Sequence, residues 1–287
     1  LNDQGFVNVT PRGMFITDEG KLVVDGLSSF MQEVMGLTGL ELQLKESLNV
    51  DEVIIVSGDS DDQDWVRLDM GKACVERIKQ HAQQEKDLTI GVTGGSTMAA
   101  VAEMMVPMNS SSSYLFVPAR GGLGEEVDYQ ANTIAAKMAR KARGEYKLLH
   151  VPDQLSESSY QTMIKEPAIR EMINIIKNAE IVIHGIGDAL TMARRRNTSE
   201  AVIQFLEKEQ AVSEAFGYYF NKDGQVVHNV RTIGIQMRDL EKTEFVMTVA
   251  GGRSKAEAII SYFKKGKSNL LITDEAAAKQ VLRELSL

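Results

Sequence analysis

The sequence predicts an α/β protein whose doubly wound, mainly parallel sheet is preceded by a β-hairpin and a linker helix. Two observations carry this prediction. From residue 50 onward, short apolar runs rich in Val and Ile alternate with helical patterns, as expected for strands buried on both faces. Glycine-rich turns follow several of these runs, at the points where strands would enter right-handed crossovers.

The composition limits the classes of protein to which the chain can belong. The chain has 287 residues, of which 43% are hydrophobic and 25% charged, so it can bury a full core, and disorder and fibrous repeats are excluded. Its single cysteine, Cys74, cannot form an internal disulfide. We find no long apolar run and no export signal, and we expect a cytoplasmic protein.

The charge balance limits what the chain can bind. Against 32 Lys and Arg stand 40 Asp and Glu, giving a net charge of −8. Contact with nucleic acid must therefore come from a local basic element. The chain also begins at Leu1, without an initiator Met and inside what looks like a hairpin, which suggests a piece of a longer protein.

The first 48 residues predict a hairpin and a helix. Two short alternating runs, 6–10 and 14–16, flank a turn containing Pro11 and Gly13, and a helix start follows at 17–19. Apolar residues then recur every three or four positions over 27–48, which predicts an amphipathic linker helix whose exposed stripe could pair with a second copy.

The rest of the chain alternates strands with helices. The predicted strands are 53–56, 88–92, 114–117, 146–149, 181–184, 245–249 and 270–272. The predicted helices are 65–83, 97–105, 128–142, 167–178, 199–208, 254–264 and 274–285. Because ligands of such sheets bind at the carboxyl ends of the strands, the loops there are the candidate site.

The loop after strand 88–92 has the composition of a phosphate cradle. It reads Thr93-Gly94-Gly95-Ser96-Thr97 and opens a helix, so that backbone N–H groups, two hydroxyls and the helix dipole all favour an anion. The alternative is an ordinary tight turn with an N-cap. Neither a Walker loop nor a dinucleotide fingerprint is present.

Two further strand ends and one helix start supply candidate contacts. Arg120 follows strand 114–117 among glycines and could fork onto phosphate oxygens, or it could be a surface arginine. Gln130, in the first turn of the next helix, could bond a sugar hydroxyl or face water. Gly187 and Asp188 follow strand 181–184, where the carboxylate could accept from hydroxyl pairs or simply cap a helix.

A second glycine-rich turn, 250–255, follows strand 245–249 and could bind a second anion, with Lys255 as its cation. Glu214 precedes a Tyr-rich hairpin and could reach a sugar hydroxyl, although it could also be an exposed acid. Arg195, in the Arg194–Arg196 run, could close on a phosphate or meet a partner subunit. Together the two turns favour one ligand with two phosphates.

The four glycine-rich loops, in this order and spacing, resemble the effector-binding domain of the SorC family of bacterial sugar-responsive transcriptional regulators over about residues 50–287. The resemblance implies a fold of the sugar-phosphate isomerase type and no cofactor. It is strongest to a member that represses lower-glycolysis genes, which implies fructose 1,6-bisphosphate as allosteric inducer. The residues that it implies as contacts are Gly94, Gly95, Ser96, Thr97, Arg120, Gln130, Glu214 and Lys255.

The resemblance also implies how the chain is divided. Residues 1–26 would be the remnant of a winged helix-turn-helix DNA-binding domain, with Arg12 at the hairpin tip contacting a DNA phosphate. Residues 27–49 would be the linker and oligomerisation helix, and 50–287 the effector domain. The recognition helix is not in this sequence. The expected partners are a sugar phosphate, operator DNA and further copies, as a homo-dimer or homo-tetramer.

Other function classes compete with the regulator hypothesis. A sugar-phosphate isomerase or deaminase would share the cradle, but its usual histidine after Gly187-Asp188 is missing, which leaves Asp188 and Glu214 as candidate bases. A nicotinamide dehydrogenase lacks its fingerprint. No Cys/His cluster suggests a metal, and the Asp59–Asp64 run fits a solvated loop better than a calcium loop.

Overall fold

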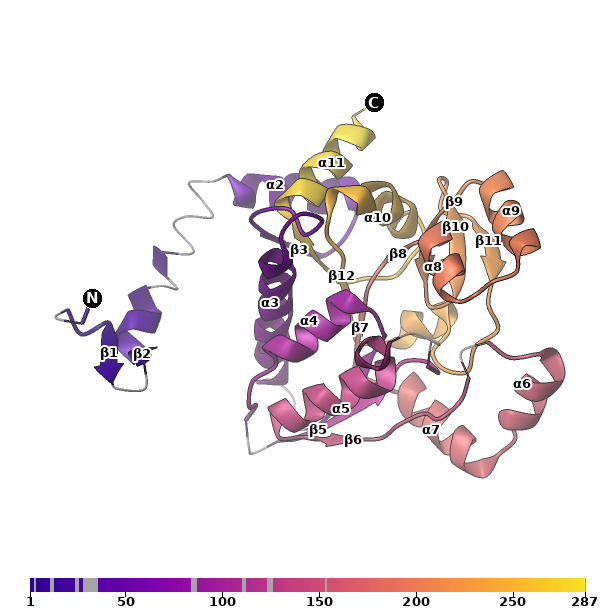
Figure 1. The fold of residues 1–287 in the computed structure, drawn as a ribbon, viewed down its shortest axis with the longest axis horizontal. Helices are drawn as coiled ribbons and strands as arrows, with labels where there is room; N and C mark the ends of the chain where they lie inside the picture. Colours follow the sequence, from indigo (N-terminus) through magenta and orange to yellow (C-terminus); the bar gives the residue numbers. More distant parts are fainter. Residues whose placement is uncertain are drawn as a thin grey trace.

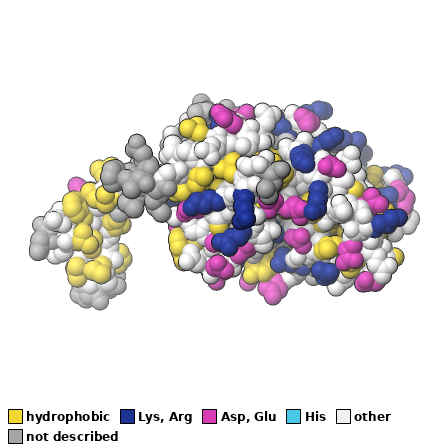
Figure 2. All heavy atoms as spheres, turned by 90° about the horizontal axis from the view of Figure 1, so that it is seen from above, with side chains coloured by type: hydrophobic (Ala, Val, Ile, Leu, Met, Phe, Trp, Pro, Cys, Tyr) yellow, Lys and Arg dark blue, Asp and Glu magenta, His cyan; other side chains and the backbone are white. Residues whose placement is uncertain are grey.

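The fold is described from a computed structural model of the chain. It describes residues 1–2, 4–10, 13–23, 26–27, 36–83, 87–109, 112–122, 126–152 and 154–286. The predicted hairpin is present as β1 (Val7–Thr10) paired antiparallel with β2 (Gly13–Ile16). Figure 1 shows it apart from the α/β body, and in Figure 2 hydrophobic side chains are visible on this part of the molecule. Met14 and Phe15 of β2 are exposed. Arg12, the predicted DNA contact, lies outside the described residues.

The body is built on the predicted parallel sheet. Over the described residues it has seven strands in the order β3-β13-β12-β7-β4-β5-β6, and every pairing is parallel. Chain order reverses between the neighbours β4 and β7, which makes this the topological switch point. The bounds are β3 (Glu52–Val56), β4 (Asp87–Val92), β5 (Ser113–Pro118), β6 (Glu145–Tyr146), β7 (Ile181–His184), β12 (Phe245–Val249) and β13 (Leu270–Asp274).

Side-chain alternation divides the core between the two faces of the sheet. In β7, Ile181 and Ile183 belong to one hydrophobic cluster and Val182 to the other, as period-2 geometry requires. Helices α3 (Asp64–Ala82), α4 (Ser96–Met104) and α5 (Ala131–Ala142) cover the first face. The second is covered by α2 (Leu37–Leu48), α7 (Pro167–Lys177), α10 (Ala256–Phe263) and α11 (Glu275–Leu285).

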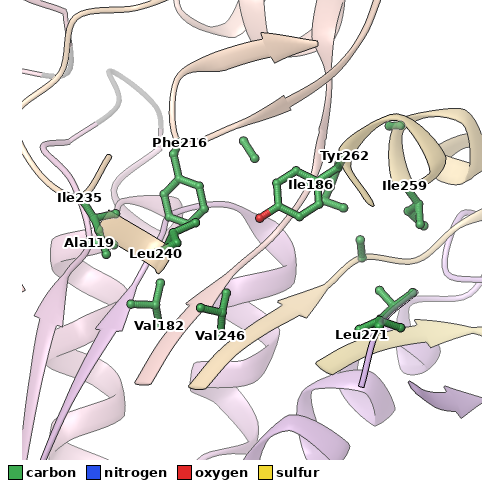
Figure 3. Close-up of a cluster of buried hydrophobic side chains, with 14 of the residues drawn as sticks. Ala119, Val182, Ile186, Phe216, Ile235, Leu240, Val246, Ile259, Tyr262 and Leu271 are labelled. Carbon is green, nitrogen blue, oxygen red and sulfur yellow. The ribbon is translucent and has the colours of Figure 1, made fainter. Parts of the chain in front are cut away.

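The cluster on the second face extends beyond the strands toward the carboxyl edge of the sheet. Figure 3 shows Val182, Val246 and Leu271 from three strands below the rings of Phe216 and Tyr262. Both rings are buried. The residues that close the top of the core therefore also support the loops at the strand ends.

A small cap lies over one end of the sheet (Figure 1). It is an antiparallel sheet in the order β11-β10-β9-β8, with its own core around Leu206 and Tyr219. The sequence predicted only its hairpin and α9, because β8 is two residues long and carries no period. Its elements are β8 (Gly187–Asp188), α8 (Ala189–Arg195), α9 (Glu200–Lys208), β9 (Ala211–Ala215), β10 (Tyr218–Asn221) and β11 (Val226–Asn229), and α6 (Glu157–Met163) precedes it.

Two predicted elements differ in extent. The strand predicted at 146–149 is the short β6. Leu149 donates its N–H to Asn132 Oδ1 and accepts from Asn132 Nδ2 with its C=O, at 3.0 Å each, so its backbone pairs with a side chain and not with a strand. In the region of the predicted 27–48 helix, α2 begins at Leu37, after Gly36 in the left-handed region at φ 72°. Residues 28–35 of that prediction lie outside the described part of the chain.

Three short 3-10 helices complete the described elements: η1 (Val127–Tyr129), η2 (Met237–Lys242) and η3 (Arg253–Lys255). Among the helices that the structure describes, none is both long enough and apolar enough to cross a bilayer.

The contact between α3 and α4 yields a matched pair of stability predictions. A Cβ on Gly71 would lie 2.8 Å from the backbone oxygen of Ala100, whereas a Cβ on Gly39 in α2 would meet nothing within 4 Å. We expect Gly71→Ala to lower the free energy of unfolding by about 1–3 kcal/mol through overpacking. Gly39→Ala should leave it unchanged or raise it by up to about 1 kcal/mol.

Urea unfolding of the two variants beside the parent chain measures both effects. Equal stability of Gly71→Ala and the parent would contradict the close approach of the two helices.

Candidate functional site

A cavity of about 430 Å³ opens at the switch point, above the carboxyl ends of β4 and β7. Loops from five strands converge on it, since parallel strands all end at the same edge of the sheet. Of the residues predicted as effector contacts, the structure brings nine together in its lining: Gly94, Gly95, Ser96, Thr97, Arg120, Gly187, Arg195, Glu214 and Lys255.

The cradle predicted at 94–97 forms the first wall. α4 begins at Ser96, so the N–H groups of its first turn have no acceptor within the helix and lie at the cavity with the hydroxyls of Ser96 and Thr97. Gly95 adopts φ +112° and donates its N–H to the carbonyl of Tyr129 at 2.8 Å. A Cβ on Gly94 would lie 2.6 Å from that same oxygen. This glycine therefore lets η1 approach closely and shapes the cradle from behind.

A buried cluster of charges forms the floor on the cap side. The Glu214 Oε1 atom accepts from Arg196 Nη2 at 2.8 Å and from the N–H of Gly217 at 2.6 Å, and Arg120 Nη1 lies 3.4 Å away. Burial alone would raise the pKa of Glu214, but Arg196 and Arg120 hold that pKa below its usual value. Glu214 is therefore ionised and held in place, and neither it nor Arg120 is the exposed surface residue that the alternative interpretations described.

The opposite wall carries cations. Arg195 at the end of α8 and Lys255 in η3 both line the cavity. Burial lowers the pKa of the Lys255 ammonium, and Arg195 lowers it further, while Asp188 and Asp61 act in the opposite direction. A partly buried lysine beside an arginine is stabilised by an anion placed between them.

The N–H groups of the second glycine-rich turn donate hydrogen bonds to carboxylates of the same chain. Asp274 accepts from the N–H of Gly252 at 2.6 Å, and Asp61 accepts from the N–H of Ser254 at 2.7 Å and from its hydroxyl at 2.9 Å. Asp59 accepts from the N–H of Arg253 at 3.3 Å. The expectation of a second backbone nest therefore does not hold for this turn. Asp59 and Asp61 lie in the loop predicted as solvated, and Asp61 is exposed, but both also accept hydrogen bonds from this turn.

Two predicted contacts lie outside the lining. Asp188 caps α8 by accepting the N–H of Thr191 at 2.8 Å, which is the structural role that the sequence left open for it. Gln130 occupies the N-cap position of α5 without a side-chain cap hydrogen bond, and its Oε1 lies near Gly122. Asp188 still acts on the lining, because it raises the pKa of Lys255.

Several lining residues were not predicted from the sequence as contacts, namely Ser60, Asp61, Arg67, Tyr129 and Phe216. The first three follow β3, and the strand-end rule could have found them. The sequence did not indicate that Phe216 lines the cavity, because its backbone is in a left-handed conformation, at φ 54°, that bulky residues rarely adopt. Its ring packs against His184, with centroids 4.6 Å apart.

His184 supports the cavity from beneath. It is fully buried, its Nδ1 lies 3.0 Å from the carbonyl oxygen of Gly185, and its Nε2 lies 2.9 Å from Thr248 Oγ1 and 3.1 Å from the Tyr262 hydroxyl. Since a carbonyl only accepts, Nδ1 carries a proton and Nε2 accepts. Burial lowers the pKa of His184 to about 4, so the ring is neutral near pH 7. This ring fixes the Gly185–Gly187 loop in the cavity wall.

Among the residues described, no group of three or more His, Cys, Asp or Glu side chains could hold a metal ion. Cys74 is buried in the sheet core, and burial raises the pKa of its thiol.

Comparison with known proteins identifies similar chains. The family model described as "Putative sugar-binding domain" matches residues 32–283. The chain is 51% identical over 286 residues to the central glycolytic genes regulator of Priestia megaterium, covering 100% of this chain and 83% of the relative. It is 50% identical over 284 residues to the regulator of that name from Bacillus subtilis, covering 99% and 83%.

Solved structures of similar proteins have the same fold as this chain. A crystal structure described as a putative SorC family transcriptional regulator from Enterococcus faecalis is 42% identical, with a TM-score of 0.80, over 85% of this chain and 99% of that one. The full-length sorbitol operon regulator SorC of Klebsiella pneumoniae shares the fold with a TM-score of 0.76 at 20% identity, over 85% and 80%.

The buried histidine predicts a pH dependence of stability. With a folded pKa of about 4 against 6.5, His184 binds its proton more readily in the unfolded chain, so its contribution to stability is present above pH 6.5 and is lost as pH falls toward 4. His184→Asn keeps a donor for Gly185 and removes the titration. Between about pH 7 and pH 4.5 the parent should lose about 2.5 kcal/mol more than this variant, since each pKa unit corresponds to about 1.4 kcal/mol.

Urea unfolding at both pH values measures this difference, and the variant's own acid sensitivity is the control for the carboxylates. Parallel losses in the two proteins would contradict a neutral, buried His184.

Proposed function

The chain belongs to the SorC family of transcriptional regulators, and on that premise we propose that it is the effector-binding part of a bacterial repressor of glycolytic genes. Its inducer is fructose 1,6-bisphosphate or a related sugar phosphate, bound at the switch point. It works in the cytoplasm, where this metabolite and the operator DNA are both present. Its head, of which residues 1–26 are a part, contacts the operator, with Arg12 on a phosphate.

The observation that carries this proposal is the placement of cations opposite an anion cradle across one cavity. The first turn of α4 follows β4 and Lys255 follows β12, and β7 lies between these two strands in the sheet. Arg195 is close enough to Lys255 to lower its pKa. The charged form of Lys255 is destabilised there at an energetic cost, since both burial and Arg195 lower the pKa of its ammonium group. A ligand with negative charge at both ends relieves that cost, and a sugar bisphosphate is such a ligand.

The two ends of the ligand are held differently. Backbone N–H groups and the hydroxyls of Ser96 and Thr97 receive one phosphate. Side chains alone receive the other, because the N–H groups of the 252–254 turn are already bonded to carboxylates. The sugar lies between them, beside Glu214, with Arg120 at the floor and Gln130 and Asp188 at the border.

Binding acts through subunit packing. Ordering of the cavity loops changes how copies of the chain assemble, as a homo-dimer or homo-tetramer, and how they present their DNA-binding heads. Coupling between effector and operator sites is typically about 1–3 kcal/mol, which is about a 5- to 150-fold change in operator affinity. The repressor releases DNA when the inducer is abundant.

The proposal includes no catalysis. Glu214, the carboxylate at the floor, is held ionised by two guanidinium groups, and Asp188 is engaged by the backbone of α8. A general base works best with a pKa near its working pH, whereas Arg196 and Arg120 hold the pKa of Glu214 below its usual value. This supports binding over the isomerase or deaminase alternative.

Variants of residues at the two ends of the cavity test the proposed binding of the sugar phosphate. Thr97→Ala removes a cradle hydroxyl, and we expect it to weaken fructose 1,6-bisphosphate and fructose 6-phosphate alike, by about 10-fold. Lys255→Met removes the opposite cation. It should weaken the bisphosphate by about 10- to 100-fold and the monophosphate much less, since a charged hydrogen bond contributes about 1.5–3 kcal/mol.

Isothermal titration calorimetry measures all four affinities. Thr162→Ala and Lys165→Met, which change exposed residues away from the cavity, are the matched controls. Unchanged affinity in both cavity variants would refute the site, and conversion of either sugar to a product would refute the regulator hypothesis.

A further inference from the structure

The loop after β3 holds the turn that carries Lys255. Asp61 accepts twice from Ser254, with Oδ2 from the backbone N–H at 2.7 Å and with Oδ1 from the hydroxyl at 2.9 Å. A two-point contact of this kind fixes orientation as well as distance, and an ionised acceptor strengthens each hydrogen bond. Because Ser254 directly precedes Lys255, Asp61 restrains the backbone at the point where the lysine side chain begins.

The 59–61 loop is itself fixed to the turn by a second carboxylate. The N–H of Ser60 donates to Asp274 Oδ2 at 2.9 Å, and the N–H of Gly252 donates to the same oxygen at 2.6 Å. Asp274 is fully buried. One interior carboxylate therefore bridges the two segments, and Asp61 is the next residue along the loop.

The close approach of the loop and the turn needs a glycine. Gly252 adopts φ +96°, in the region that favours glycine, and a Cβ added to it would collide with the Asp61 carboxylate. The backbone of the turn is therefore shaped to receive the side chain of Asp61.

Asp61 also acts electrostatically on this end of the effector cavity. Asp61 and Lys255 both line that cavity. The Asp61 carboxylate raises the pKa of the Lys255 ammonium, against the larger effect of burial. Its negative charge also opposes a phosphate bound at the same wall. Asp61 thus has two opposite effects on an anionic ligand, since it holds the lysine in place and repels the anion.

We propose that Asp61 is a positioning residue for Lys255 and thereby makes the cavity select a ligand with a second phosphate. This inference deepens the proposed function and rests on it. The hydrogen bonds to Ser254 favour the bisphosphate, whereas the carboxylate charge by itself disfavours it. A substitution that keeps the hydrogen bonds and removes the charge separates the two effects.

Asp61→Asn and Asp61→Ala form the required pair. The Asn side chain can still accept from the Ser254 N–H and donate to the Ser254 hydroxyl, which both donates and accepts. Ala removes both hydrogen bonds, and the two variants lose the same charge. We expect Asp61→Ala to bind fructose 1,6-bisphosphate at least about 5-fold more weakly than Asp61→Asn, as loss of one or two hydrogen bonds does. Fructose 6-phosphate should bind the two variants alike.

Isothermal titration calorimetry of the full chain measures these affinities. Asp62→Ala is the matched control, because Asp62 is an exposed carboxylate next to Asp61 and does not line the cavity. It should bind both sugars like the parent chain. In a Lys255→Met background, Asp61→Ala and Asp61→Asn should bind the bisphosphate equally, since a residue that acts through Lys255 has no effect without it.

Equal affinity of Asp61→Ala and Asp61→Asn for the bisphosphate would overturn the inference. An equal loss of both sugars in Asp61→Ala would also overturn it, because the whole cavity would then be distorted. A difference between the two variants that persists without Lys255 would show that Asp61 does not act through the lysine. Failure of the parent chain to bind fructose 1,6-bisphosphate would instead refute the proposed function.

A measurement without ligand tests the contact independently of the proposed function. Amide hydrogen exchange at Ser254, followed by NMR, should be faster in Asp61→Ala than in Asp61→Asn, because a hydrogen-bonded N–H is protected. Equal exchange rates would overturn the positioning role of Asp61 whether or not a sugar binds.

Discussion

One buried carboxylate joins the cap of this molecule to its sheet. Glu214 belongs to the cap strand β9, Arg196 ends the cap helix α8, and Arg120 follows β5 of the large sheet. All three side chains are nearly inaccessible to solvent. Removing one member of such a group leaves an unpaired charge in the interior, at a cost of about 3–5 kcal/mol. The shape of the effector cavity depends on this contact, because the cap forms its floor and the sheet forms its wall.

The main sheet could be predicted from the sequence because its strands are buried on both faces. Such strands are continuous apolar runs, as at 181–184 and 245–249, and their boundaries in the structure agree with the prediction. The cap could not be predicted in the same way. Its strands are short, and β8 consists of Gly187 and Asp188 alone, so it exists only because Glu214 and Ser213 of β9 pair with it. Tertiary contacts of this kind leave no periodic pattern.

The site was predictable where backbone geometry defines it and unpredictable where side chains compete for partners. Gly94–Thr97 follows directly from a glycine-rich turn between a strand and a helix. The turn at 252–255 has the same appearance in sequence. What distinguishes it is Asp61, about 190 residues away in the chain and in hydrogen-bond contact with Ser254. A single sequence gives no indication that a distant carboxylate fills a particular turn.

Because the N–H groups of the 252–254 turn are hydrogen-bonded within the chain, the far wall of the cavity does not need a ligand to hold its structure. Gly252 and Ser254 donate their N–H groups to Asp274 and Asp61 of the same chain, so these groups need no metabolite as a hydrogen-bond partner. In the proposed binding mode, the side chains at positions 195 and 255 meet the second end of the ligand, and neither Arg195 nor Lys255 is fully buried. Exchange of these two residues would then adapt the scaffold to metabolites of different charge, while the hydrogen bonds that hold the turn stay in place.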